Sequence, residues 1–94
     1  MVLRLSYGEF DESFGGDSPG LTGGGGAAVE GAAASSMGKV EVYKVHHHGS
    51  KYSSTAGWLS TTQPKAAVIS VGDGNSYGHP TSVALTNLHN AGVK

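Results

Sequence analysis

The fold is decided by one stretch near the middle of the chain, VEVYKVHHHGSKYSSTAGWLSTTQPKAAVISV, which covers residues 40–71. Its first six residues alternate in side-chain direction between two faces, a period of two that predicts a β-strand. Thr55 can cap a short helix that runs through about Thr62, since Pro64 then breaks it. The near-continuous apolar run at residues 66–71 predicts a second strand, central in its sheet and covered on both faces.

The residues before this unit predict a β-hairpin and a helix. Residues 2–6 and 10–14 alternate around a tight turn at Gly8, and strand 2–6 is expected to leave an open sheet edge. The Gly/Ala-rich stretch 18–39 is expected to be a flexible insert, with a helix over its Ala-rich part at 27–36.

The residues after the unit predict a last helix. Thr81 or Ser82 can cap its start, and Gly92 lies where a C-terminal cap belongs. The resulting order is β-β-(α)-β-α-β-α, which predicts a layered α/β (α+β) fold with helices packed on a sheet. The side chains expected in the core are Trp58, Leu59 and Ile69.

Composition limits what the chain can do. With 94 residues it forms one small domain at most, and Gly occupies 16 positions, which leaves few side chains for packing. A net charge of −1 provides no basic patch for nucleic-acid backbones, so a phosphate-bearing substrate would need a metal. Because the chain has no Cys, the available metal ligands are His, Asp and Glu. No apolar run is long enough for a membrane span.

Polar side chains gather in three loops, and each loop follows a predicted strand. The loops contain Gly-Gly-Asp at 15–17, His-His-His-Gly-Ser at 46–50 and Asn-Ser-Tyr-Gly-His-Pro at 75–80. In layered α/β folds the loops at the carboxyl ends of strands share one rim, so these residues can converge on a single site. One Asp and two His loci are ligand types of Zn and Mn sites.

This ordered set of motifs carries a family resemblance. Together with Leu-Arg-Leu-Ser-Tyr-Gly at 3–8 and Ala-Val-Ile-Ser-Val-Gly at 67–72, it resembles the carboxyl half of the metallo-β-lactamase-fold domain of ComEC/Rec2-type competence proteins. The resemblance covers nearly the whole chain except residues 21–39. It implies that residues 1–94 are a partial domain, half of an αββα sandwich, and we expect a fragment of a larger hydrolase.

The resemblance also implies roles for individual residues. Asp17 is similar to the carboxylate that bridges two metal ions in that family. His47 is similar to the last ligand of the second metal, with His48 as the near alternative. His79 has no place in the family's common ligand set and is therefore expected to be a catalytic residue that contacts substrate or transfers a proton, since imidazole exchanges protons near neutral pH.

The function implied by the resemblance is metal-dependent hydrolysis of a phosphodiester in DNA or a nucleotide. Two divalent ions, Zn or Mn, would bind in the parent domain, and Ser50 and Asn75 could hydrogen-bond the substrate. The first-metal motif, His-x-His-x-Asp-His or a close variant, is absent, so its ligands are expected in a missing N-terminal half. We therefore expect this chain alone to be inactive and the parent protein to lie outside the cytoplasm or at a membrane.

Simpler interpretations remain beside these. Asp17 can be an ordinary turn carboxylate, and His79 a loop residue held extended before Pro80. The histidines at 46–48 can be a tag remnant or a solvated loop, and the sequence leaves open which of the three would ligate. The alternative functions are a non-catalytic remnant or partner-binding piece, and a lactamase-fold hydrolase of another ester, amide or lactone.

Overall fold

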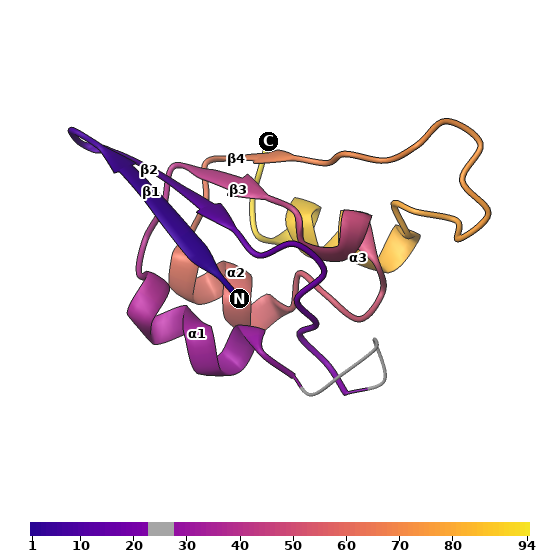
Figure 1. Cartoon of the computed structure of the whole chain (residues 1–94), viewed down its shortest axis with the longest axis horizontal. Coiled ribbons are helices and arrows are strands. Elements are labelled where there is room, and N and C mark those ends of the chain that lie inside the picture. Colours follow the sequence, from indigo (N-terminus) through magenta and orange to yellow (C-terminus); the bar gives the residue numbers. More distant parts are fainter. Residues whose placement is uncertain (23–27) are drawn as a thin grey trace.

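The computed structural model describes residues 1–22 and 28–94 as a mixed sheet with helices on one of its faces (Figure 1). The strands lie in the order β1 (Leu3–Tyr7), β2 (Phe10–Phe14), β3 (Val42–Lys44) and β4 (Ala66–Val68). β1 pairs antiparallel with β2, as predicted for the hairpin, whereas β2, β3 and β4 run parallel. This arrangement confirms the predicted α/β class, and β1 forms one edge of the sheet as expected.

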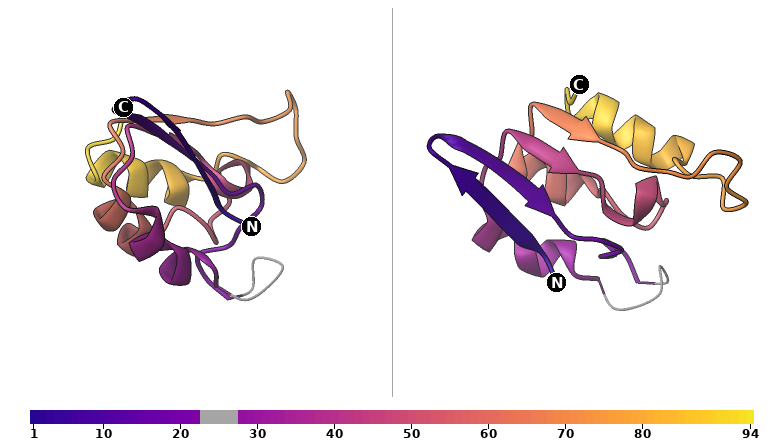
Figure 2. Two further views of the ribbon diagram at one scale, coloured as in Figure 1. Left: turned by 60° about the vertical axis from the view of Figure 1, so that its left-hand side comes forward. Right: turned by 45° about the horizontal axis from the view of Figure 1, so that its top comes forward.

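The helices form a single layer below the sheet, as the two views of Figure 2 show. They are α1 (Glu30–Met37), the short 3₁₀ helix η1 (His46–Gly49), α2 (Ala56–Thr62) and α3 (Ser82–Asn90). The predicted caps of α2 and α3 are confirmed: the side chain of Thr55 accepts a hydrogen bond from the Trp58 N–H, and that of Thr81 accepts one from the Ala84 N–H.

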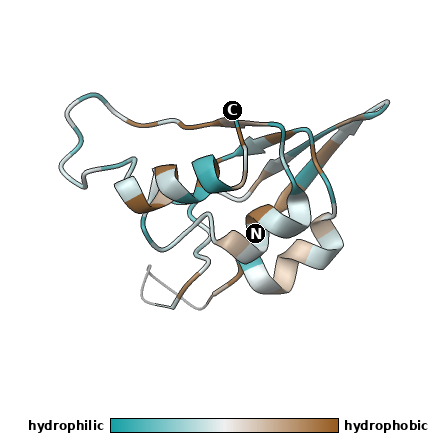
Figure 3. Ribbon diagram, turned by 180° about the vertical axis from the view of Figure 1, so that it is seen from behind, coloured by the Kyte–Doolittle hydropathy of each residue, from teal (hydrophilic) through white to brown (hydrophobic). Residues whose placement is uncertain are grey.

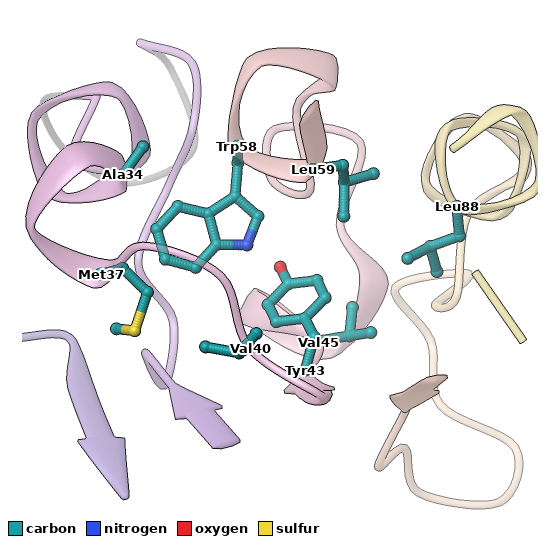
Figure 4. Close-up of a cluster of buried hydrophobic side chains, with 8 residues drawn as sticks. All are labelled: Ala34, Met37, Val40, Tyr43, Val45, Trp58, Leu59 and Leu88. Carbon is teal, nitrogen blue, oxygen red and sulfur yellow. The ribbon is translucent and has the colours of Figure 1, made fainter. Parts of the chain in front are cut away.

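The core lies between the sheet and the helices (Figure 4). Tyr43 from the middle of β3 points toward the helices and is fully buried beside Trp58 and Leu59 of α2. The prediction that Trp58 and Leu59 lie in the core is confirmed, and Ile69 packs against the core partly buried. The buried cluster consists of Ala34, Met37, Val40, Tyr43, Val45, Trp58, Leu59 and Leu88.

Within residues 1–22 and 28–94, the opposite face of the sheet carries no helix, and it is apolar over the hairpin. The strand register aligns Leu5 with Glu12, Val42 and Ala66, while the neighbouring row with Tyr43 faces the helices. Leu3, Leu5 and Tyr7 of β1 are therefore on the uncovered side, and each is more than half exposed. Figure 3 shows hydrophobic and hydrophilic stretches along the hairpin. We call this side of the sheet the open face.

The prediction of a central strand at residues 66–71 is wrong. β4 ends at Val68, lies at an edge of the sheet and leaves Val68 51% exposed. An apolar run predicts a hydrophobic strand, but it does not predict how many neighbouring strands that strand has. The order of strands in the sheet could therefore not be predicted from it. On the outer side of β4, the Lys94 N–H donates to the Lys65 carbonyl and the Lys94 carbonyl accepts from the Ala67 N–H. Lys94 is thus in the position of a parallel neighbour.

The Gly/Ala-rich stretch contains an ordered helix. Residues 30–37 of the predicted insert form α1, and Glu30, Ala34 and Met37 of this helix are buried. The glycine run at 23–26, predicted to be flexible, and the first residue of the predicted helix 27–36 lie outside the described residues.

Candidate functional site

The polar loops converge because three strands run in parallel. The carboxyl ends of β2, β3 and β4 meet at one edge of the sheet, and the loops that leave them emerge on the same side (Figure 2). There they enclose a hollow of about 340 Å³. The side chains that line it are Asp17, His47, His48, Tyr77 and His79. The structure thus brings together Asp17 and the histidines singled out from the sequence, apart from His46.

Asp17 and His48 are the closest pair in this hollow. Asp17 Oδ1 lies 3.4 Å from His48 Nε2, and both side chains are half exposed or more. The other ring nitrogen, Nδ1, lies 2.7 Å from the Ser70 carbonyl oxygen. A carbonyl can only accept, so Nδ1 carries a proton, and a neutral His48 directs the Nε2 lone pair at the carboxylate. Two electron-rich atoms at this distance repel unless a proton or a cation lies with them.

The backbone at His47 and His48 is held in the left-handed region. Their φ/ψ values are 50°/40° and 55°/24°, a conformation that residues with a side chain rarely adopt. Two hydrogen bonds hold it: the His47 N–H donates to the Gly16 carbonyl at 2.8 Å, and the Ser50 N–H donates to the His47 carbonyl at 2.9 Å. Consecutive strained residues of this kind are typical of binding and catalytic sites.

His47 also carries an unpaired polar atom. Its Nδ1 is buried and has no hydrogen-bond partner among the described residues. Its ring lies edge-on to that of His79, with centroids 5.8 Å apart. A buried imidazole nitrogen without a partner costs free energy.

The third loop is fixed by its own hydrogen bonds. The Asn75 side-chain amide donates to the His79 carbonyl at 2.8 Å and accepts from the His79 N–H at 3.0 Å. The loop is tied to the second one because Thr81 donates to the Gly49 carbonyl from both its N–H and its hydroxyl, each at 2.9 Å. Tyr77 stacks on His79 with centroids 5.8 Å apart and remains 80% exposed.

The two residues expected to bind substrate lie differently. The side-chain amide of Asn75 forms its hydrogen bonds within its own loop. Asn75 also lines a second hollow of about 190 Å³ together with His48, Tyr77 and His79. Ser50 is buried, and its hydroxyl accepts from the Tyr52 N–H. Their role toward substrate stays a prediction.

The residues present supply only part of a metal site. Within residues 1–22 and 28–94, no group of three or more His, Cys, Asp or Glu side chains is placed to hold a metal ion. The hollow offers the Asp17–His48 pair, whose oxygen and nitrogen suit Zn or Mn. His48 also shows a feature of metal-binding histidines, since its other nitrogen bonds to a backbone carbonyl.

His46, the third histidine of the run, lies away from the hollow in the protein interior. Its Nδ1 lies 2.9 Å from Glu30 Oε1, and both side chains are fully buried. Burial raises the pKa of the Glu30 carboxyl, but hydrogen bonds from His46 and from Thr55 and Ser54 outweigh it and hold the pKa below its usual value.

Glu30, the partner of His46, was not predicted from the sequence. Glu30 is the one charged residue in the long small-residue stretch 18–38. A single charge retained in such a stretch is a signal that it has a partner, because an unpaired charge on a buried helix face is costly.

The sequence of this chain is similar to short segments of three larger proteins. No protein-family model matches it. It is 41% identical over 56 residues to ComE operon protein 3 of Bacillus subtilis, and 39% identical over 69 residues to Recombination protein 2 of Haemophilus influenzae. It is 37% identical over 54 residues to Competence protein ComA of Neisseria gonorrhoeae. The chain is similar to competence proteins.

These matches cover 60%, 73% and 57% of this chain but only 7%, 9% and 8% of the respective relatives. They confirm the resemblance to competence proteins, whereas the metallo-β-lactamase fold and hydrolase activity stay predictions. In the part of the chain that the structure describes, no helix has the length and hydrophobicity needed to cross a membrane.

Proposed function

We propose that this chain is part of a competence-type, metal-dependent hydrolase of phosphodiester bonds in DNA or nucleotides. The observation that carries the proposal is the Asp17–His48 pair, 3.4 Å apart in a hollow that also contains His47 and His79. The similarity to competence proteins supports DNA as the substrate class. The same resemblance favours a parent protein outside the cytoplasm or at a membrane.

The residues fit a metal in part. Asp17 and His48 would hold an ion between them, because a carboxylate oxygen and an imidazole nitrogen that face each other 3.4 Å apart could both bind one cation. His47, which also lines the hollow, is a further candidate ligand. When bound, divalent ions supply positive charge that stabilises the phosphate oxygens in the transition state.

The remaining side chains have roles around that charge. His79 would give a proton to the departing oxygen, since it borders the hollow and imidazole is a common general acid. Asn75 would affect the substrate indirectly. Its side-chain amide bonds both the N–H and the carbonyl of His79 and so holds that residue in place. Ser50, being buried, would support the left-handed turn through its N–H.

The open face supports the proposed half-domain. Leu3 and Leu5 are each more than half exposed there, and Tyr7 is 84% exposed. An αββα sandwich has a second sheet packed on this side, which would bury these side chains. We infer that the missing N-terminal half, with the ligands of the first metal, packs on the open face.

One observation favours a second candidate, a non-catalytic partner-binding piece. The described residues hold no group of three metal ligands, so the hollow by itself lacks a complete metal site. If the parent protein supplies no further ligands, the loops would serve only to bind a partner. The two functions differ in whether the Asp17–His48 pair binds a divalent ion.

The test is a titration of the full 94-residue chain with Zn²⁺, followed by calorimetry. The wild-type chain is expected to bind Zn²⁺, and Asp17→Asn and His48→Ala are each expected to bind at least about tenfold more weakly, because each removes one ligand. His89→Ala is the matched control, since His89 is an exposed histidine on α3 outside the hollow. Binding that is equal in wild type and Asp17→Asn would contradict the proposal.

A second measurement addresses hydrolysis. The chain alone is expected not to turn over nitrophenyl phosphodiesters, because its ligands are incomplete. In the longer parent protein, Asp17→Asn is expected to abolish metal-dependent turnover and His79→Ala to slow it with metal content unchanged. Full rate and full metal content in the Asp17→Asn parent would remove the hydrolase assignment.

A further inference from the structure

A buried carboxylate–histidine pair lies directly behind the candidate site. Glu30 begins α1, and His46 is the first residue of η1, which carries His47 and His48. Neither Glu30 nor His46 has any exposed surface. Because the two elements are otherwise distant in the chain, this pair links α1 to the loop that forms one wall of the hollow.

The Glu30 carboxylate is fully engaged. Its Oε1 accepts from His46 Nδ1 at 2.9 Å and from the Ser54 N–H at 2.7 Å. Its Oε2 accepts from the Thr55 N–H at 2.9 Å and from the Thr55 hydroxyl at 2.8 Å. Each oxygen thus receives two donors, which is the full capacity of a carboxylate.

His46 is held from three further sides. Its N–H donates to the Tyr43 hydroxyl at 3.0 Å, and its carbonyl accepts from the Ser53 hydroxyl at 2.8 Å. Its ring packs edge-on against that of Tyr43 and tilted against that of Trp58. The Nε2 atom has no hydrogen-bond partner among the described residues, so the bond to Glu30 is the one hydrogen bond that the ring makes there.

The loop that carries Asp17 rests on this pair at both of its ends. A Cβ on Gly15 would overlap His46 Nε2, and a Cβ on Gly20 would overlap Glu30 Oε2. Only glycine lets the backbone approach the two side chains this closely. Asp17 lies between these two contacts.

Backbone hydrogen bonds complete the link between the loops. The Gly20 N–H donates to the Tyr52 carbonyl at 2.7 Å, and the His47 N–H donates to the Gly16 carbonyl at 2.8 Å. The Asp17 loop and the His47–His48 turn are therefore fixed to each other and to the same buried pair.

We propose that Glu30 and His46 are positioning residues, which set the separation of Asp17 from His48 without contacting a ligand themselves. This inference rests on the proposed function in one respect, namely that the separation of Asp17 from His48 serves to bind a metal ion. Their place between the two loops explains why a carboxylate–histidine pair is kept in a core that otherwise consists of apolar and hydroxyl side chains.

The test compares amide hydrogen exchange by NMR in the full chain with and without substitutions at the pair. In Glu30→Gln, an NH₂ group that cannot accept replaces one carboxylate oxygen. The two donors that bonded that oxygen then have no acceptor. We expect the amides of Ser18, Gly20 and His47 to exchange about tenfold or more faster relative to those of α3. Gly15→Ala, which keeps the Glu30 carboxylate and displaces the His46 ring, is expected to accelerate the same amides.

Two controls separate positioning from general stability. Gly57→Ala adds a Cβ on α2 in open space and should leave the loop amides unchanged. Leu88→Ala removes a buried side chain of α3 and should accelerate α3 amides at least as much as loop amides. If Glu30→Gln fails to fold, Gly15→Ala decides the question.

The proposal is overturned if the three loop amides keep wild-type rates in the folded variants, or if loop and α3 amides accelerate equally as in a global loss of stability. A wild-type chain that fails to bind Zn²⁺ would contradict the proposed function alone, because the exchange pattern is measured without metal.

Discussion

Two carboxylate–histidine pairs lie close together in this chain and differ in nearly every physical respect. Glu30–His46 is fully buried, 2.9 Å long, and its carboxylate accepts four hydrogen bonds. Asp17–His48 is exposed, 3.4 Å long, and its histidine is oriented by a single carbonyl. A buried pair whose carboxylate is fully engaged within the protein can only hold structure, whereas an exposed pair that lines a hollow can bind a ligand.

The largest expected effect is on folding. Glu30→Ala leaves His46 and the donors of Ser54 and Thr55 buried without a partner, which costs about 3–5 kcal/mol of unfolding free energy. A chain of this size has little stability to lose, so we expect it to be largely unfolded in circular dichroism. Asp17→Ala should change the free energy of urea unfolding by less than about 0.5 kcal/mol. Equal effects of the two substitutions would remove the distinction between the pairs.

Acid should weaken the buried pair. The folded-state pKa of Glu30 lies below its ordinary value of 4.5, so its contribution to stability is complete above that value and is lost as the pH falls through the folded pKa. The unfolding free energy of the wild-type chain should therefore be lower at pH 3 than at pH 7.

The control for this pH dependence is a matched carboxylate. Hydrogen bonds from Arg4 and Ser6 also lower the pKa of Asp11, but at the surface of the hairpin. Glu30→Gln should flatten the dependence of unfolding free energy on pH more than Asp11→Asn does. A Glu30→Gln curve parallel to that of the wild type would show that Glu30 is not responsible.

A smaller effect is expected at the glycine that contacts His46. Gly15→Ala should lower the unfolding free energy by about 1–3 kcal/mol, because the new methyl group overlaps the imidazole. Gly57→Ala should raise it by up to about 1 kcal/mol, since that position lies in α2 and faces open space. Thermal unfolding of the two variants measures the direction of each change in unfolding free energy. An unchanged unfolding free energy in Gly15→Ala would show that the loop does not pack against His46.

The sequence predicted features that depend on local chemistry. The hairpin, the strand in residues 40–45 and the caps Thr55 and Thr81 follow from side-chain alternation and from hydroxyls that accept at helix starts. The convergence of Asp17 with the histidines followed from parallel strands sharing one rim.

Features that depend on distant partners were not predicted. The apolar run at 66–71 gave no information on sheet order, so β4 was expected in the centre and lies at an edge. The run His46–His48 gave no information on which ring turns inward, because that depends on Glu30, which lies 16 residues away. The open face is likewise a property of the assembled sheet.

The central claim is that His48, paired with Asp17, is a cation ligand, whereas His46 is not. Long-range ¹H–¹⁵N imidazole spectra of the full chain, recorded with and without Zn²⁺, test it most directly. We predict a proton on His48 Nδ1, a Zn²⁺-dependent shift of its Nε2, and unchanged resonances for His46 and His89. In Asp17→Asn the shift should require a much higher Zn²⁺ concentration. An unshifted His48, or shifts of equal size at His48 and His89, would contradict the account.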